Sequence, residues 1–141
     1  MIAVVTGGSR GIGYAVAEEF VRRDCQVVVV ARDRARGEQA CSALGSTLVV
    51  ADLGTLAGIR AAADEILALC PKIDVFVHNA GIWPTKRVLT ADGLEQAFVV
   101  NHLAPFLLNH RLEQRFRDCD SRIVQVSAGL YIKGRFDPDR T

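Results

Sequence analysis

The sequence has few cysteines, few aromatic residues and almost no net charge, and each scarcity excludes a class of protein. The four cysteines of the 141-residue chain form no Cys-x-x-Cys pair, so neither zinc nor a disulfide framework is indicated. Reduced, partly buried thiols are expected instead at Cys25, Cys41, Cys70 and Cys119. A formal net charge of +1, with acids interspersed among the bases, argues against a nucleic-acid-binding surface. No metal site is predicted.

Long hydrophobic runs are also missing. The continuous apolar runs are far too short to span a bilayer, so no membrane segment is expected. The first residues lack the charged and apolar regions of a signal peptide, which predicts a cytoplasmic protein. With 50% hydrophobic and 23% charged residues, the composition is typical of a globular α/β protein, and we expect one domain over residues 1–141.

Apolar runs and helical patterns alternate along the chain. Buried strands are predicted at residues 3–6, 26–31, 47–50, 75–78 and 122–127. Helices are predicted between them at residues 12–23, 34–44, 55–69 and 93–117, and a loop over 129–141. This alternation indicates right-handed βαβ units in a doubly wound, Rossmann-like parallel sheet with strand order 3-2-1-4-5. A sixth βα unit would be expected after residue 141.

A glycine-rich segment connects the first strand to the first helix. Residues 6–13 read Thr-Gly-Gly-Ser-Arg-Gly-Ile-Gly, and strand, glycine turn and helix in this order are typical of dinucleotide binding. The glycines permit a tight turn, a close approach of the backbone to a pyrophosphate and close packing of the helix. The free N–H groups and the helix dipole would face the phosphates. The predicted contacts are Gly7, Ser9, Arg10, Gly11, Ile12 and Gly13.

The end of the second strand indicates which dinucleotide is preferred. Ala31 stands where a carboxylate would bind the ribose 2′-hydroxyl of NAD, and Arg32 follows it. The guanidinium groups of Arg32 and Arg10 would converge on a 2′-phosphate, which favours NADP(H). The alternative is a strand one residue longer, with Asp33 taking the hydroxyl. Two further arginines are expected on the solvated face of the next helix, Arg34 and Arg36.

Three further motifs follow in order, Asp52-Leu53, Asn79-Ala80-Gly81 and Val100-Asn101. Together with the glycine segment they resemble the short-chain dehydrogenase/reductase family over essentially the whole chain. Residues 92–108 are most similar to its branch of retinol dehydrogenases and WW-domain oxidoreductases. The resemblance implies reversible hydride transfer between NADP(H) and a small-molecule alcohol/carbonyl pair, hydrophobic in this branch. A homo-oligomer is one option that it leaves open.

The resemblance also assigns roles to the residues of these motifs. Asp52 would contact the adenine amino group and Leu53 would contribute a backbone contact. The segment Asn79, Ala80 and Gly81 would line the adenosine ribose.

Asn101 has a separate physical argument. Pro105 lies four residues later, lacks an N–H and crowds the Asn101 carbonyl, which therefore loses its helical partner. An ordinary kinked helix is one interpretation. The resemblance implies another, in which this backbone holds a water of a catalytic proton relay.

The catalytic residues of the family are incomplete in this sequence. The family uses a tyrosine with a lysine four residues later, but Tyr14 has Glu18 at that spacing and Tyr131 has Arg135. The family's catalytic serine aligns with Ala128. Ser127 precedes it and would point to the opposite face of a strand unless the strand end is distorted. The alternatives to an enzyme are therefore a non-catalytic dinucleotide-binding module or an inactive fragment truncated after the fifth strand.

Several aromatic side chains lie in or beside these motifs. His78 is expected to be a hydrogen-bonded structural residue at a buried strand end. Trp83 would either shape the mouth of the cofactor or substrate site or cap a loop. His102 and His110 have no metal-ligand spacing and are assigned no site.

Overall fold

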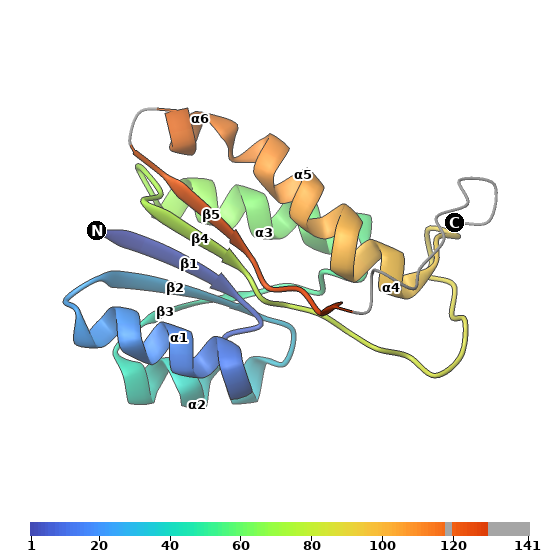
Figure 1. Ribbon diagram of the computed structural model, residues 1–141, viewed down its shortest axis with the longest axis horizontal. Coiled ribbons are helices and arrows are strands. Elements are labelled where there is room, and N and C mark those ends of the chain that lie inside the picture. The colour runs from blue at the N-terminus through green and yellow to red at the C-terminus, as the bar shows by residue number, and fades with distance from the viewer. Residues whose placement is uncertain (118–119, 130–141) are drawn as a thin grey trace.

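A five-stranded parallel sheet forms the centre of the computed structural model, which describes residues 1–117 and 120–129 (Figure 1). Its order is β3-β2-β1-β4-β5, and every neighbouring pair is parallel. This confirms the predicted fold class and strand order. The strands are β1 (Ile2–Thr6), β2 (Gln26–Ala31), β3 (Thr47–Val50), β4 (Val75–His78) and β5 (Arg122–Gln125).

Helices cover both faces of the sheet (Figure 1). Helices α1 (Gly11–Arg22) and α2 (Arg34–Leu44) lie on one face, while α3 (Leu56–Leu69) and α5 (Ala104–Arg111) pack side by side on the other. The short helix α6 (Glu113–Arg117) continues beyond α5. No helix within the described ranges combines the length and the hydrophobicity that crossing a bilayer requires.

The core has two halves because successive side chains of a strand point to opposite faces. On β1, Ile2 and Val4 join the cluster under α3 and α5, whereas Ala3 and Val5 join the cluster over α1 and α2. The buried strands therefore read as continuous apolar runs, which is why the sequence predicts them closely.

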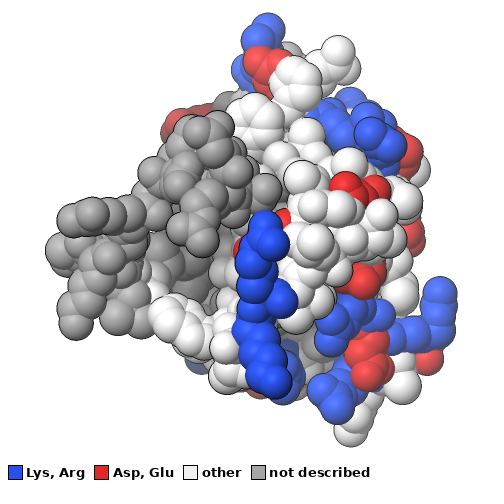
Figure 2. Space-filling model, turned by 90° about the vertical axis from the view of Figure 1, so that its right-hand side faces the viewer, with Lys and Arg blue, Asp and Glu red and all other residues white. Residues whose placement is uncertain are grey.

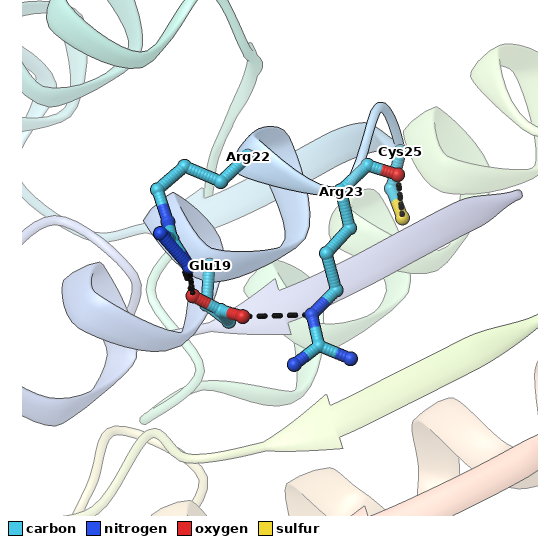
Figure 3. Close-up of polar contacts among 4 residues, drawn as sticks. All are labelled: Glu19, Arg22, Arg23 and Cys25. Atoms are coloured by element: carbon cyan, nitrogen blue, oxygen red, sulfur yellow. Dashed lines mark hydrogen bonds and ion pairs between the residues drawn. The ribbon is translucent and has the colours of Figure 1, made fainter.

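The turn after α1 shows how a connection without proline is fixed (Figure 3). The carboxylate of Glu19 pairs with Arg22 at 2.6 Å and with Arg23 at 2.7 Å. The pKa of Glu19 is lowered, mainly by the hydrogen bond from Arg23. The N–H groups of Asp24 and Cys25 donate to Val21 and Phe20, closing the helix end. Asp24 takes a φ of 57°, the left-handed conformation that this turn requires.

The predicted helix 93–117 is wrong as a single element. The structure instead has α4 (Gln96–Phe98), the π-helical segment η1 (Val99–Leu103) and α5, with a break at Leu112 before α6. The N–H of Ala104 donates to the Val99 carbonyl five residues back, and Pro105 follows within the first turn of α5. Because Pro105 has no N–H to complete an α-helical ladder, the kink falls where the sequence predicts it.

The predicted strand 122–127 is also shorter than expected. Strand β5 ends at Gln125, and the N–H of Val126 donates a last bond to the His78 carbonyl at 2.9 Å. Every residue of β5 is solvent-exposed, so no buried side chain stabilises a continuation of the strand beyond Gln125. Cys119 and the predicted loop with Tyr131 lie outside the described residues, whereas Cys25, Cys41 and Cys70 are buried, unpaired thiols.

Candidate cofactor-binding site

A cleft of about 490 Å³ opens at the carboxyl ends of the strands. Figure 2 looks onto this side of the molecule, where basic side chains gather in several clusters beside uncharged surface. All the predicted cofactor contacts except Gly13 line the cleft: Gly7, Ser9, Arg10, Gly11, Ile12, Arg32, Asp52, Leu53, Asn79, Ala80 and Gly81. Sequence segments far apart in the chain therefore meet at one site.

The glycine turn is shaped by two left-handed residues. Gly7 has a φ of 68° and its N–H donates to the Val30 carbonyl of the neighbouring strand at 2.8 Å. Gly11 has a φ of 57°, and nothing lies within 4 Å of where its Cβ would be. The first turn of α1 is thus open on the side of the cleft, so a ligand has room to contact the protein backbone there.

Gly13 acts through packing instead of lining the cleft. A Cβ at this position would lie 2.4 Å from the Asn79 amide nitrogen and 2.5 Å from the Gly7 carbonyl oxygen. Only a glycine lets α1 approach the ends of β1 and β4 this closely. The sequence-based reason for this glycine, close packing of the helix, agrees with this geometry.

The start of α1 differs from the starts of the neighbouring helices. Asp33 caps α2 by accepting from the Arg36 N–H, and Thr55 caps α3 by accepting from the Gly58 N–H. Arg10 occupies the corresponding position of α1 and makes no side-chain cap. The N–H groups of the first turn of α1 therefore remain available to an anion in the cleft.

Hydrogen bonds between β1 and β4 hold the floor of the cleft. The Thr6 hydroxyl accepts from the N–H groups of Asn79 and Ala80 at 3.1 and 3.0 Å. The side-chain amide of Asn79 in turn donates to the carbonyls of Thr6 and Gly7 at 3.1 and 3.2 Å. The Asn79 side chain thereby ties the end of β4 to the glycine turn.

Two charged residues of the cleft lining, Arg32 and Asp33, follow the end of β2. Strand β2 ends at Ala31 as predicted, and the longer strand considered as an alternative does not form. The Asp33 carboxylate accepts from the Arg36 N–H at 3.0 Å and lies 3.7 Å from its guanidinium. Arg36 is exposed on α2, as predicted, and it also lines the cleft, which the sequence does not predict. Arg34 lies on the surface and pairs with Glu38.

Asp52 organises the turn that follows β3. Its carboxylate accepts from the Gly54 N–H at 2.9 Å, and its carbonyl accepts from the Thr55 hydroxyl at 3.3 Å. The Asp52 carbonyl oxygen would lie 2.0 Å from a Cβ at residue 58, so Gly58 is required for this turn. Leu53 is buried beside it. No motif in the sequence indicates this role of Gly58.

Asn101 lies on η1 and points its side chain toward the loop after β4. Its side-chain oxygen accepts from the Ile82 N–H and its side-chain nitrogen donates to the Ile82 carbonyl, both at 2.9 Å. Asn101 lines a second pocket beside the cleft. This pair of hydrogen bonds fixes the loop. The sequence does not predict the contact, because the argument from Pro105 concerns only the backbone carbonyl of Asn101.

The remaining catalytic candidates are not brought together. Ser127 and Ala128 are exposed beyond the end of β5, and neither belongs to the described residues that line the cleft. Because β5 ends at Gln125, the strand geometry assumed for Ser127 is wrong. Tyr14, the one tyrosine in the described ranges, packs from α1 against the core.

His78 is a structural residue at the end of β4. Its ring is 1% exposed, its Nε2 lies 2.8 Å from the Asn109 side-chain oxygen, and it meets Phe76 edge-on. Burial lowers the pKa of His78, although the bond with Asn109 opposes the shift. A buried, neutral imidazole fits the structural role predicted for it.

These features define the class of the protein as a doubly wound α/β domain of the Rossmann type, with its cleft over a glycine turn. The family model for short chain dehydrogenases matches residues 1–135. The chain belongs to the short-chain dehydrogenase/reductase family, whose members are oxidoreductases that bind nicotinamide dinucleotides.

Similar proteins agree with this assignment. The chain is 41% identical to dehydrogenase/reductase SDR family member 13 of Bos taurus, covering 96% of this chain and 37% of the relative. It is 36% identical to retinol dehydrogenase 14 of Mus musculus, covering 95% of this chain and 46% of the relative. The chain therefore spans less than half the length of these curated relatives.

Solved structures show the same fold. The crystal structure of a putative betaketoacyl-ACP reductase superposes with a TM-score of 0.80 at 31% identity, over 96% of this chain and 57% of that one. A short-chain dehydrogenase from Sphingobium yanoikuyae in complex with NADPH gives a TM-score of 0.77 at 29% identity, over 93% and 55%.

Proposed function

We propose that the chain is the cofactor-binding part of an NADP(H)-dependent oxidoreductase that interconverts an alcohol and a carbonyl compound. When bound, the cofactor supplies or accepts the hydride. The chain's own residues would hold the pyrophosphate over the glycine turn and the adenosine between the ends of β2 and β3. The observation that carries the proposal is the cleft, whose lining includes three arginines: Arg10 in the glycine turn, Arg32 after β2 and Arg36 in α2.

The geometry of the glycine turn fits a pyrophosphate. The N–H groups at the start of α1 lack a side-chain cap, and the open face at Gly11 lets the phosphate oxygens approach them. The positive end of the helix dipole adds to this attraction. A cleft of about 490 Å³ is large enough for an elongated ligand of this kind.

The charges at the end of β2 favour a 2′-phosphate over a free ribose hydroxyl. Asp33, which directly follows Arg32, caps α2 and pairs with Arg36, and Asp52 of the same lining accepts from the Gly54 N–H. Arg32 is exposed and forms no ion pair within the described chain, so its guanidinium is free to bind a phosphate. The NADPH complex of the Sphingobium relative supports the same choice.

Substitution of Arg32 tests this preference. We expect Arg32→Ala to weaken NADPH binding about tenfold and NADH binding less than twofold, because a charge-assisted bond to the 2′-phosphate is lost. Titration calorimetry measures both affinities. Arg34→Ala is the matched control, since its side chain pairs with Glu38 outside the cleft. Equal losses for the two nucleotides would refute the phosphate assignment.

A second candidate is a dinucleotide-binding module without turnover. It is favoured by the position of Tyr14, which packs against the core, and by the exposed position of Ser127 away from the cleft. Oxidation of NADPH by the 141-residue chain, followed with a panel of aldehydes and ketones, tests the second candidate. Measurable turnover contradicts a module without catalysis, whereas binding without turnover is expected of both candidates.

A further inference from the structure

A second pocket adjoins the cofactor cleft beyond the end of β4, between the following loop and the start of α4 and η1. Its volume is about 410 Å³, within the usual range of small-ligand sites. Ile82 lines both the pocket and the cleft, so the two hollows meet at this residue. The bonds between Asn101 and Ile82 hold the shared wall in place.

The pocket lies at the end of the cleft that a substrate would share with the cofactor. In the sheet, β4 is separated from β2 by β1, and Arg32 of the proposed ribose-phosphate site follows β2. A dinucleotide anchored at β2 and over the glycine turn would extend its nicotinamide toward β4. The pocket therefore adjoins the reacting end of the proposed cofactor.

The walls of the pocket combine an aromatic ring with uncompensated positive charge. The indole of Trp83 is 73% exposed. Lys86 and Arg87 also line the pocket, and neither pairs with a carboxylate among the described residues. The described lining contains one carboxylate, Glu95, whose side chain accepts from the Phe98 N–H at 2.7 Å as the cap of α4. The described lining thus contains two cationic side chains and one carboxylate, which caps α4.

We propose that this pocket binds the anionic end of the substrate, an amphipathic carbonyl compound whose aromatic or apolar part stacks on Trp83. A carboxylate on such a compound would pair with Lys86 and Arg87. This rests on the proposed oxidoreductase function, since it names the substrate class of the same site. An aromatic face beside the cations suits a flat, conjugated body.

The chain carries its own reporter for this pocket, because Trp83 is its single tryptophan. Fluorescence quenching of Trp83 is measured with 4-acetylbenzoate and with its methyl ester, which share the ring and the ketone but differ in charge. At low ionic strength we expect the acid to bind about tenfold more tightly than the ester, as two partly screened ion pairs would give. Added salt should reduce this preference.

A double variant locates the charge. Lys86→Gln combined with Arg87→Gln should abolish the preference for the acid and leave the affinity for the ester unchanged. Arg34→Gln, which removes a surface cation on α2, should preserve the preference. Equal affinities for acid and ester, absence of saturable quenching, or a preference that survives the double substitution would each overturn the proposal.

Two further measurements distinguish a substrate pocket from a membrane contact and from a failed cofactor site. Vesicles of phosphatidylserine and phosphatidylcholine test whether this loop meets a membrane surface: a blue shift of Trp83 on vesicles, without saturable quenching by the acid, overturns the pocket assignment. Calorimetry with NADPH on the unaltered chain tests the proposed function separately. NADPH binding without acid preference refutes only the substrate class, whereas no NADPH binding refutes the oxidoreductase proposal itself.

Discussion

At the scale of single residues, the polar groups beneath the cleft are buried in pairs. The Thr6 hydroxyl accepts from the backbone N–H groups of Asn79 and Ala80, and the Asn79 side-chain amide donates to the backbone carbonyls of Thr6 and Gly7. His78 is likewise bonded to Asn109, but its Nδ1 finds no partner within the described structure. An unpaired polar atom in the core costs free energy, and burial of the ring disfavours its protonated form.

His78 should make the protein less stable in mild acid. Its folded pKa is lowered, mainly by burial, so the unfolded chain takes up the proton first. Stability is therefore full above the ordinary value of 6.5 and declines as the pH falls below it. In urea unfolding between pH 5 and 7, we expect His78→Asn to remove this decline, at a packing cost of about 1–2 kcal/mol. His110→Asn, on the exposed face of α5, should retain the decline. A decline that persists in His78→Asn would contradict the assignment.

Gly13 is required by packing, and Gly13→Ala tests this. The added methyl group would collide with the Asn79 amide and the Gly7 carbonyl, so α1 must move away from the sheet. We expect a loss of about 2–4 kcal/mol in unfolding free energy together with weaker NADPH binding. Gly129→Ala, where the added atom meets nothing within 4 Å, is the control and should change stability by under about 0.5 kcal/mol. If Gly13→Ala unfolds at the same temperature as the unaltered protein, the packing role of Gly13 is wrong.

Some residues of the site are predictable from the sequence and others are not. The glycine turn, Arg32 and the Asn79 segment are adjacent to strand ends, so the sequence pattern places them at one edge of the sheet. Arg36 is missed because it reaches the cleft from within α2, where a basic residue reads as solvated surface. The Asn101–Ile82 contact joins residues 19 positions apart through an irregular loop, which no periodic pattern encodes.

At the scale of elements, local chemistry decides where helices begin and end. Asp33, Thr55 and Glu95 cap their helices through side chains, and the starts of α2 and α3 lie within one residue of the predicted ones. The predicted helix over 93–117 fails because hydrophobic periodicity continues through the π-helical turn. The proline indicates where the helix is distorted. The type of distortion depends on the backbone hydrogen bond that the proline cannot make, and the apolar pattern carries no information about it.

The end of α1 offers a stabilising substitution. Asp24 adopts the left-handed conformation with a side chain, and its negative charge sits at the carboxyl end of the helix dipole. Asp24→Gly should raise the free energy of unfolding by up to about 1 kcal/mol, since glycine adopts this conformation without a steric penalty. Chemical denaturation measures the change, and Asp24→Asn isolates the effect of charge. Destabilisation by Asp24→Gly would show that the backbone conformation is not strained.

At the scale of the whole molecule, the sheet explains why the fold is predictable. Strands β1, β2 and β4 are buried on both faces, so their apolar runs stand out in the sequence and fix the doubly wound order. Strand β5 is the exception, since Ile123 and Val124 remain 48% and 45% exposed. Its exposure explains why the predicted end at residue 127 is wrong: apolar character continues past the last backbone pairing.

The same arrangement makes the cleft a property of the whole sheet. The carboxyl ends of β2, β3, β1 and β4 each contribute a separate segment, and the arginines come from the segments after β1 and β2. A ligand must therefore span several strands to use the site fully, as a dinucleotide does.

Titration calorimetry of the unaltered chain with NADPH and with NADH measures the cofactor preference. We expect one NADPH per chain, with an affinity at least about tenfold higher than that for NADH because three arginines line the cleft. Well-folded protein that releases no heat with either nucleotide, or that binds NADH more tightly, would contradict the account.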